Sequence, residues 1–178
     1  QIEVGIDGCS VPNFAMPLYN AALGLARFCD PRGLPPERAA ACRRITQSMV
    51  ANPFMVAGSG RFDTRLMEVC EGRLLVKSGA EGYLAIGVLA GALGTESAGV
   101  GITLKVSDGD AESRTRVDTN SRVRPSVGLE ILRQMGYIGD KELEALAREF
   151  GPTKPVANWR KLVVGETRPI FTLQRPAG

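Results

Sequence analysis

The chain has 178 residues, of which 44% are hydrophobic and 23% are charged, and its formal net charge is +3. This composition is typical of a globular domain that can bury its own core, and it excludes a disordered chain. No apolar run reaches the roughly 20 residues of a membrane-spanning helix. We therefore expect one cytoplasmic domain that binds neither a membrane nor nucleic acid. Histidine is absent, which excludes histidine-dependent catalytic triads and histidine-ligated zinc from these residues.

The first seventy residues predict one strand followed by helices. Apolar and polar residues alternate over 2–7, which indicates a half-buried strand. Helices are predicted to begin at Pro17 and at Pro36, because proline is favoured in the first turn. A shorter helix is predicted over 64–70, with Asp63 as its N-cap.

The second part of the chain has the sequence pattern of a β-sheet. Strands are predicted over 73–78, 83–89 and 99–106, and the short connections between them favour antiparallel hairpins. Two more helices follow, and a last strand is predicted over 161–164. Helices, then an antiparallel sheet, then helices again predict the α+β class, with the helices segregated from the strands.

The densest group of basic residues lies in the sequence SRTRVDTNSRVR, residues 113–124. Asp118 interrupts this group, and the remaining basic residues are spread along the chain. We interpret the segment as a solvated loop that leads into a helix, rather than as a nucleic-acid site.

Lys77, Ser78 and Gly79 come directly after the apolar residues 74–76 of a predicted strand. Lysine is costly to bury, so its place here has two interpretations. The strand ends and Lys77 reaches water, or the lysine belongs to a site where it acts as a base or holds a carboxylate. Glu81, two residues after Gly79, is a candidate partner for the lysine.

Two further loops carry reactive side chains. Asp7 and Cys9 lie at the end of the first predicted strand, and Cys9 alone cannot form a closed zinc site, which needs about four ligands. Arg61 stands beside Asp63 and two glycines, which is compatible with an anion contact, an internal ion pair or a helix cap. The residues alone leave these alternatives open.

Several stretches together resemble the L-asparaginase II family, the rhizobial-type amidohydrolases. They are GIDGCSVPNFAMPLYNAALGLARF, MVANPFMVAGSGRFDTRLM, LLVKSGAEGYLAIGV and GVGITLKVSDGD, and the closing NWRKLVVGETRPIF fits as well. The resemblance implies a fold like that of serine β-lactamases and penicillin-binding proteins. It also implies hydrolysis of the side-chain amide of L-asparagine to L-aspartate and ammonia by serine–lysine catalysis.

The resemblance also assigns roles to individual positions. It implies that Lys77 and Asp7 belong to the catalytic apparatus and that Cys9 is one ligand of a zinc ion whose other ligands lie outside this chain. The residues expected to contact the substrate are Ser78, Gly79, Ala80, Glu81 and Arg61.

One element of the family pattern is missing from these residues. No serine or threonine has a lysine three positions later, so the Ser-x-x-Lys nucleophile is absent. The resemblance therefore implies that residues 1–178 are the C-terminal half of such an enzyme, active with an N-terminal half and expected as a homodimer. Another amidase, a penicillin-interacting hydrolase and a non-catalytic fragment are the alternatives.

Overall fold

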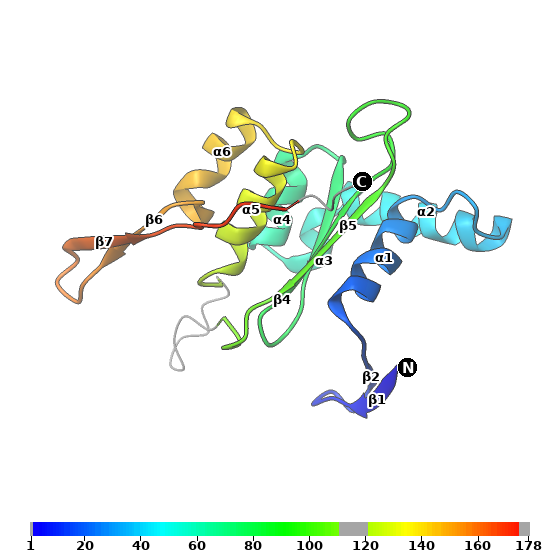
Figure 1. The fold of residues 1–178 in the computed structure, drawn as a ribbon, viewed down its shortest axis with the longest axis horizontal. Helices are drawn as coiled ribbons and strands as arrows, with labels where there is room; N and C mark the ends of the chain where they lie inside the picture. Colours follow the sequence, from blue (N-terminus) through cyan, green and yellow to red (C-terminus); the bar gives the residue numbers. More distant parts are fainter. Residues whose placement is uncertain (1, 111–120, 175–178) are drawn as a thin grey trace.

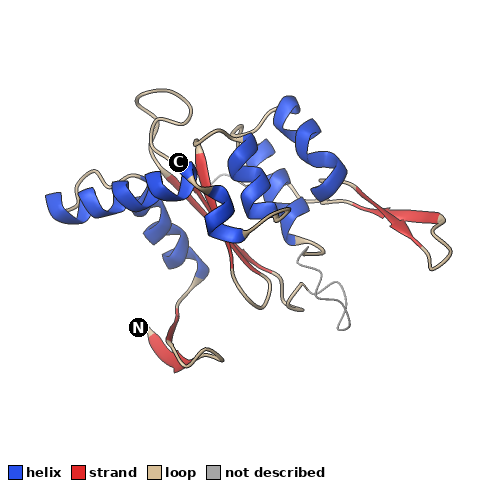
Figure 2. Ribbon diagram, turned by 180° about the vertical axis from the view of Figure 1, so that it is seen from behind, coloured by secondary structure: helices blue, strands red, loops and turns tan. Residues whose placement is uncertain are grey.

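The computed structural model describes residues 2–110 and 121–174, and its helices and strands confirm the predicted α+β class (Figures 1 and 2). The elements in chain order are β1 (Glu3–Ile6), β2 (Pro12–Ala15), α1 (Leu18–Cys29), α2 (Pro36–Ala51), α3 (Pro53–Ala57), α4 (Phe62–Val69), β3 (Leu74–Ser78), β4 (Tyr83–Val88), β5 (Val100–Lys105), α5 (Arg124–Gln134), α6 (Asp140–Phe150), β6 (Lys154–Ala157) and β7 (Val163–Thr167).

The central sheet contains β3, β4 and β5 in that order, and both pairs are antiparallel, as the short connections predicted. Lys77 lies opposite Ala85, and Ala85 lies opposite Thr103. Directly opposed residues point to the same side of a sheet, and successive residues point to opposite sides. Lys77 and Ser78 therefore lie on opposite faces.

One face of the sheet forms the main core with α4, α5 and α6 (Figure 1). Apolar side chains of β3 and β4 are fully buried here, and Gly128 of α5 lies against Leu84 and Ile86. Phe62 of α4 and Phe150 of α6 meet edge to face, with ring centroids 5.3 Å apart. This geometry is favourable for aromatic pairs and links the two helices.

Helix α1 covers the other face of the sheet along β4 and β5. The contact is close because glycines line the sheet where the helix crosses it. A Cβ atom on Gly101 would lie 1.9 Å from the Ala22 carbonyl oxygen, and one on Gly87 would lie 2.4 Å from Cys29 Sγ. The glycines of β4 and β5 therefore set the position of α1 on the sheet.

Two hairpins project from this body, β1–β2 at one end and β6–β7 at the other (Figure 2). Their side chains are exposed, with Val4 at 62% and Val164 at 64%. The prediction of a half-buried strand over 2–7 was wrong about burial, because no described residue covers that apolar face. The strands β2 and β6 were not predicted, and β7 lies slightly later than expected.

Two smaller predictions also need correction. Helix α4 begins at Phe62 with Arg61 at its N-cap, so Asp63 lies within the first turn and its carboxylate does not cap the helix. In the basic segment, residues 113–120 lie outside the described part of the chain. Arg122 is exposed as expected, but Arg124 is largely buried and paired with Asp110.

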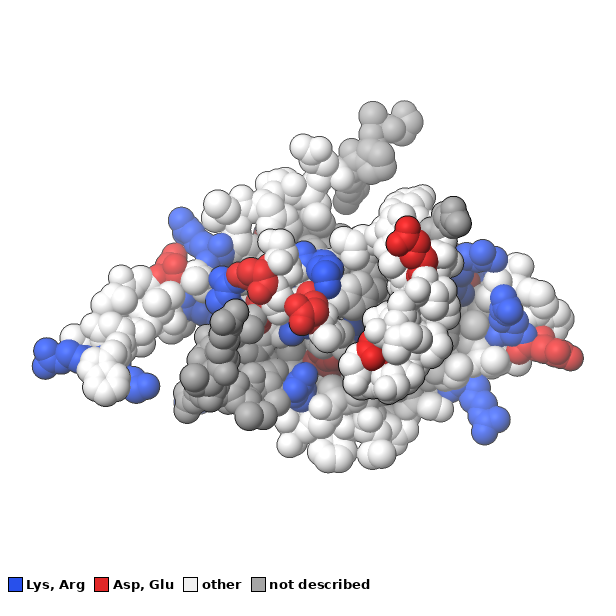
Figure 3. All heavy atoms as spheres, turned by 90° about the horizontal axis from the view of Figure 1, so that it is seen from below, with Lys and Arg blue, Asp and Glu red and all other residues white. Residues whose placement is uncertain are grey.

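The described surface carries both signs of charge. Figure 3 shows Lys and Arg side chains interspersed with Asp and Glu over the face in view. Within the described ranges, no helix has the length and apolarity that crossing a membrane requires.

Candidate active site

The turn between β3 and β4 is formed by residues 79–83, and its backbone is tightly specified. Gly79 N–H donates to the Tyr83 carbonyl at 2.9 Å, and Tyr83 N–H donates to the Ala80 carbonyl at 3.3 Å. Glu81 and Gly82, the two central residues of the turn, have φ values of +54° and +73°. A side chain at Gly82 would also meet the Val106 carbonyl oxygen at 2.6 Å. Glycine is required at position 82, because the Val106 carbonyl leaves no space for a Cβ atom and the positive φ disfavours a side chain.

Lys77 lies at the exposed edge of the sheet, just before this turn. Its Nζ donates to the Ser78 carbonyl at 2.6 Å, and the side chain is exposed. The structure supports the interpretation that Lys77 reaches water. The strand does not end at Lys77, however, because β3 continues to Ser78. The lysine is thus held beside the turn and remains accessible to a ligand or a partner chain.

Ser78 points to the opposite face and contacts α4. Its N–H donates to Asp63 Oδ2 at 2.6 Å, and its hydroxyl donates to Asp63 Oδ1 at 2.5 Å. The Asp63 residue is only 2% exposed. A buried carboxylate needs such donors, so this pair links the end of β3 to the first turn of α4.

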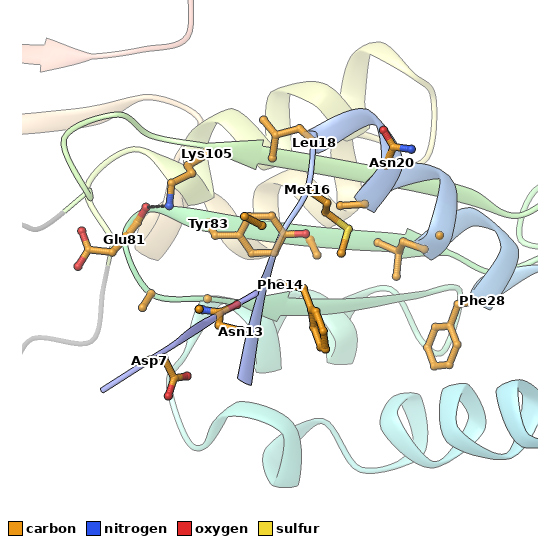
Figure 4. A pocket seen from close by; sticks show the side chains of 18 of the residues that line it. Asp7, Asn13, Phe14, Met16, Leu18, Asn20, Phe28, Glu81, Tyr83 and Lys105 are labelled. Atoms are coloured by element: carbon orange, nitrogen blue, oxygen red, sulfur yellow. Dashed lines mark hydrogen bonds between the residues drawn. The ribbon is translucent and has the colours of Figure 1, made fainter. Parts of the chain in front are cut away.

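A hollow of about 1090 Å³ lies between the β1–β2 hairpin, helix α1 and the sheet (Figure 4). Figure 4 shows Glu81 and Lys105 at one end, Phe28 at the other, and Tyr83 between them. Most of the lining is apolar, and the polar end combines Asp7 and Asn13 with the turn. A small polar ligand would be held at that end, where directional groups are available.

Four of the predicted site residues line this hollow together: Asp7, Gly79, Ala80 and Glu81. Lys77 is on the same sheet face, next to Ala85 of the lining. Ser78, Arg61 and Cys9 are not part of the lining. The structure therefore groups the turn with Asp7, and it places the other three elsewhere.

Asp7 and Cys9 belong to the tip of the first hairpin. Asp7 Oδ1 accepts hydrogen bonds from Cys9 N–H at 2.8 Å and from Val11 N–H at 3.2 Å. This is the local bonding by which aspartate stabilises a turn. Both of these bonds use Oδ1, and the residue also lines the hollow.

Cys9 is exposed and forms no disulfide, whereas Cys29 and Cys70 are buried. Burial raises the pKa of Cys29 to about 12 and that of Cys70 to about 11, so both remain protonated thiols at neutral pH. Over residues 2–110 and 121–174, no group of three or more His, Cys, Asp or Glu side chains could hold a metal ion. The described residues by themselves do not fit a zinc site.

Other residues of the site could not be inferred from the sequence. Tyr83 lines the hollow, and burial raises the pKa of its phenol. Lys105 Nζ donates to the Glu81 carbonyl at 2.8 Å. In the structure, Tyr83 pairs with Lys105 across β4 and β5. The sequence would indicate this contact only if the register of the two strands were already known.

The chain matches the model of a known protein family. The family model described as L-asparaginase II matches residues 1–169, which is nearly the whole chain. No curated protein matches the chain.

Proposed function

Because the chain belongs to the L-asparaginase II family, we propose that it forms part of an enzyme that hydrolyses the side-chain amide of L-asparagine. The products are L-aspartate and ammonia. The observation that carries this proposal is the family match over residues 1–169. The grouping of Asp7 with Gly79, Ala80 and Glu81 around one hollow supports it.

The proposed reaction uses a serine nucleophile and the amine of Lys77. The serine oxygen attacks the amide carbon, and the serine proton is transferred, with assistance from Lys77 Nζ, to the leaving amide nitrogen. Collapse of the tetrahedral intermediate releases ammonia, and water then cleaves the ester to give aspartate and free serine. Residues 1–178 contain no Ser-x-x-Lys sequence. We therefore place the nucleophile in an N-terminal half of the enzyme, supplied by a further segment or by a partner polypeptide.

The turn supplies the groups for substrate binding. We propose that Ala80 N–H, which donates to no acceptor among the described residues, stabilises the developing oxyanion. We propose that the carboxylates of Glu81 and Asp7 bind the α-ammonium group of the substrate, because both residues line the hollow. A substrate contact by Ser78 would have to replace its hydrogen bonds to Asp63. Arg61 lies outside the lining, so its predicted contact requires a substrate that extends beyond the hollow.

The direct test is ammonia release from L-asparagine by the native protein particle, with L-glutamine and a chromogenic β-lactam as parallel substrates. We expect turnover of asparagine, and we expect none from residues 1–178 produced alone. Turnover of the β-lactam with no turnover of asparagine would favour a penicillin-interacting hydrolase. Absence of all three activities in the native particle would contradict the proposal.

Zinc is a separate proposal. The exposed Cys9 thiol is a suitable zinc ligand, and the remaining ligands would come from outside this chain. We predict that Cys9→Ser lowers the zinc content per molecule of the native particle, measured by elemental analysis. Cys42→Ser is the matched control and leaves the zinc content unchanged. Equal zinc in both variants would contradict a role for Cys9.

We propose that the central sheet and its helices form one domain with a serine β-lactamase-like fold, and that the enzyme is a cytoplasmic homodimer. The β1–β2 hairpin exposes apolar side chains, which is consistent with further parts of the enzyme covering it. An intact-mass measurement and sedimentation of the native particle test the composition and the dimer.

A further inference from the structure

Arg124, the first residue of helix α5, forms a buried ion pair with Asp110, which lies 14 positions earlier in the chain. Arg124 Nε donates to Asp110 Oδ2 at 2.9 Å. The Asp110 carboxylate also accepts hydrogen bonds from Val123 N–H at 2.6 Å and Arg124 N–H at 3.1 Å. The Asp110 side chain is 0% exposed and that of Arg124 is 12% exposed. The pair is thus shielded from water and fixed at several atoms.

The location of Arg124 is unfavourable for a cation when considered alone. It is the first residue of α5, where the positive end of the helix dipole disfavours a positive charge. The Asp110 carboxylate compensates, because it binds both the guanidinium and the first backbone N–H groups of the helix. The ion pair therefore serves to hold the guanidinium in one place and one orientation.

One terminal nitrogen of that guanidinium contacts the candidate active site, and the other donates to the Ser121 hydroxyl. The first of these nitrogens donates to the Gly79 carbonyl and to the Tyr83 carbonyl, each at 2.7 Å. These two carbonyls stand at the start and the end of the turn that carries Ala80 and Glu81. Ala80 and Glu81 themselves are exposed and contribute little packing of their own. The planar guanidinium is suited to this task, since its separate nitrogens reach Asp110 and the turn at the same time.

We propose that Arg124, fixed by Asp110, is a positioning residue that holds the 79–83 turn in its catalytically competent shape. The effect of Arg124 on catalysis rests on the proposed function, whereas its effect on the shape of the turn rests on the geometry alone. Arg124 does not touch the substrate. It acts by determining where Ala80 N–H and the Glu81 side chain lie.

The experiment compares three variants of the native enzyme: Arg124→Gln, Arg124→Lys and the control Arg133→Gln. Arg133 lies on the same helix but is exposed, and among the described residues its ion pair is with Glu130. Hydrogen exchange is measured by mass spectrometry on peptides that cover residues 78–84, together with kcat and KM for L-asparagine. Thermal unfolding shows that each variant is folded.

For Arg124→Gln we expect exchange in the 78–84 peptides to become about tenfold faster. We expect kcat to fall about 10²-fold while KM changes far less, because misplaced groups lose transition-state stabilisation. Arg124→Lys should recover little activity, since one ammonium cannot reach Asp110 and both carbonyls. Arg133→Gln should match the wild type in exchange and in kcat. If Arg124→Gln does not fold, the same criteria apply to Arg124→Lys.

Unchanged exchange in the 78–84 peptides would overturn the inference, whatever the activity. Faster exchange with an unchanged kcat would overturn its catalytic part. Full activity of Arg124→Lys would also overturn it, because a charge alone would then suffice. A wild-type enzyme without asparaginase activity would instead contradict the proposed function, and the exchange result would still decide whether Arg124 holds the turn.

Discussion

Asp63 shows how one buried side chain can join two elements at the candidate site. It binds both donors of Ser78, so the last residue of β3 is fixed against the first turn of α4. The two residues are 15 positions apart in sequence. A charged residue with so little exposure is stable only when its hydrogen bonds are satisfied. The strand that carries Lys77 thereby ends at a fixed point.

We predict that Asp63→Ala lowers the free energy of unfolding by about 1–3 kcal/mol, because the Ser78 N–H and hydroxyl lose their acceptors. Urea denaturation of the variant and the wild type measures this difference. The control is Glu68→Ala on the same helix, whose exposed ion pair with Arg65 should contribute less than about 1 kcal/mol. A loss for Asp63→Ala no greater than that of the control would contradict this account.

At the scale of elements, the contact of α1 with β5 depends on the absence of a side chain at Gly101. We predict that Gly101→Ala destabilises the fold by at least about 1–3 kcal/mol, since its Cβ would overlap the Ala22 carbonyl oxygen. The control is Gly24→Ala in helix α1, where a Cβ atom meets no atom within 4 Å. It should instead stabilise the helix by about 0.5–1 kcal/mol. Thermal unfolding of the two variants distinguishes the effects, and equal unfolding temperatures would contradict the close packing.

The end of α1 is joined to the sheet by Asp30, and this connection depends on pH. Asp30 accepts two hydrogen bonds from the Arg32 side chain and one from Gly99 N–H at 3.1 Å. Hydrogen bonding from Arg32 is the main reason that the pKa of Asp30 is lowered from 3.8 to about 2. A lowered pKa means that the ionised carboxylate stabilises the folded state above pH 3.8. That contribution is lost as the pH falls through 2.

We predict that Asp30→Asn lowers the free energy of unfolding by about 1 kcal/mol at pH 7, a value reduced by the exposure of Arg32. The difference from the wild type should shrink steadily between pH 4 and pH 2. Urea denaturation at a series of pH values measures it. A difference that stays constant over this range would show that the charge of Asp30 is not responsible.

At the scale of the whole molecule, sequence patterns predicted the strands and turns whose formation depends on neighbouring residues. The strands β3, β4 and β5 follow from apolar runs joined by short turns, and GAEG is a turn because Gly82 tolerates its positive φ. The apolar alternation over 2–7 correctly predicted a strand. It could not predict burial, because alternation shows which side chains share a face and not what covers that face.

The candidate site was predictable only in part, for a related reason. Residues adjacent in sequence, such as Gly79, Ala80 and Glu81, could be grouped from the motif alone. The contact of Arg124 with Gly79 spans 45 positions and depends on how α5 packs beside the sheet. A basic residue within a basic segment gives no sign of that contact. Long-range partners of this kind follow from tertiary packing and from no local pattern.

The proposed role of Lys77 in amide hydrolysis is tested most directly by kcat for L-asparagine in the native enzyme carrying Lys77→Ala. We predict a loss of about 10²-fold or more, because the amine assists proton transfer. The control Lys141→Ala removes an exposed lysine of α6 and should leave kcat unchanged. If Lys77→Ala retains the kcat of the wild type, Lys77 is only an exposed residue near a strand end, and the proposed mechanism is wrong.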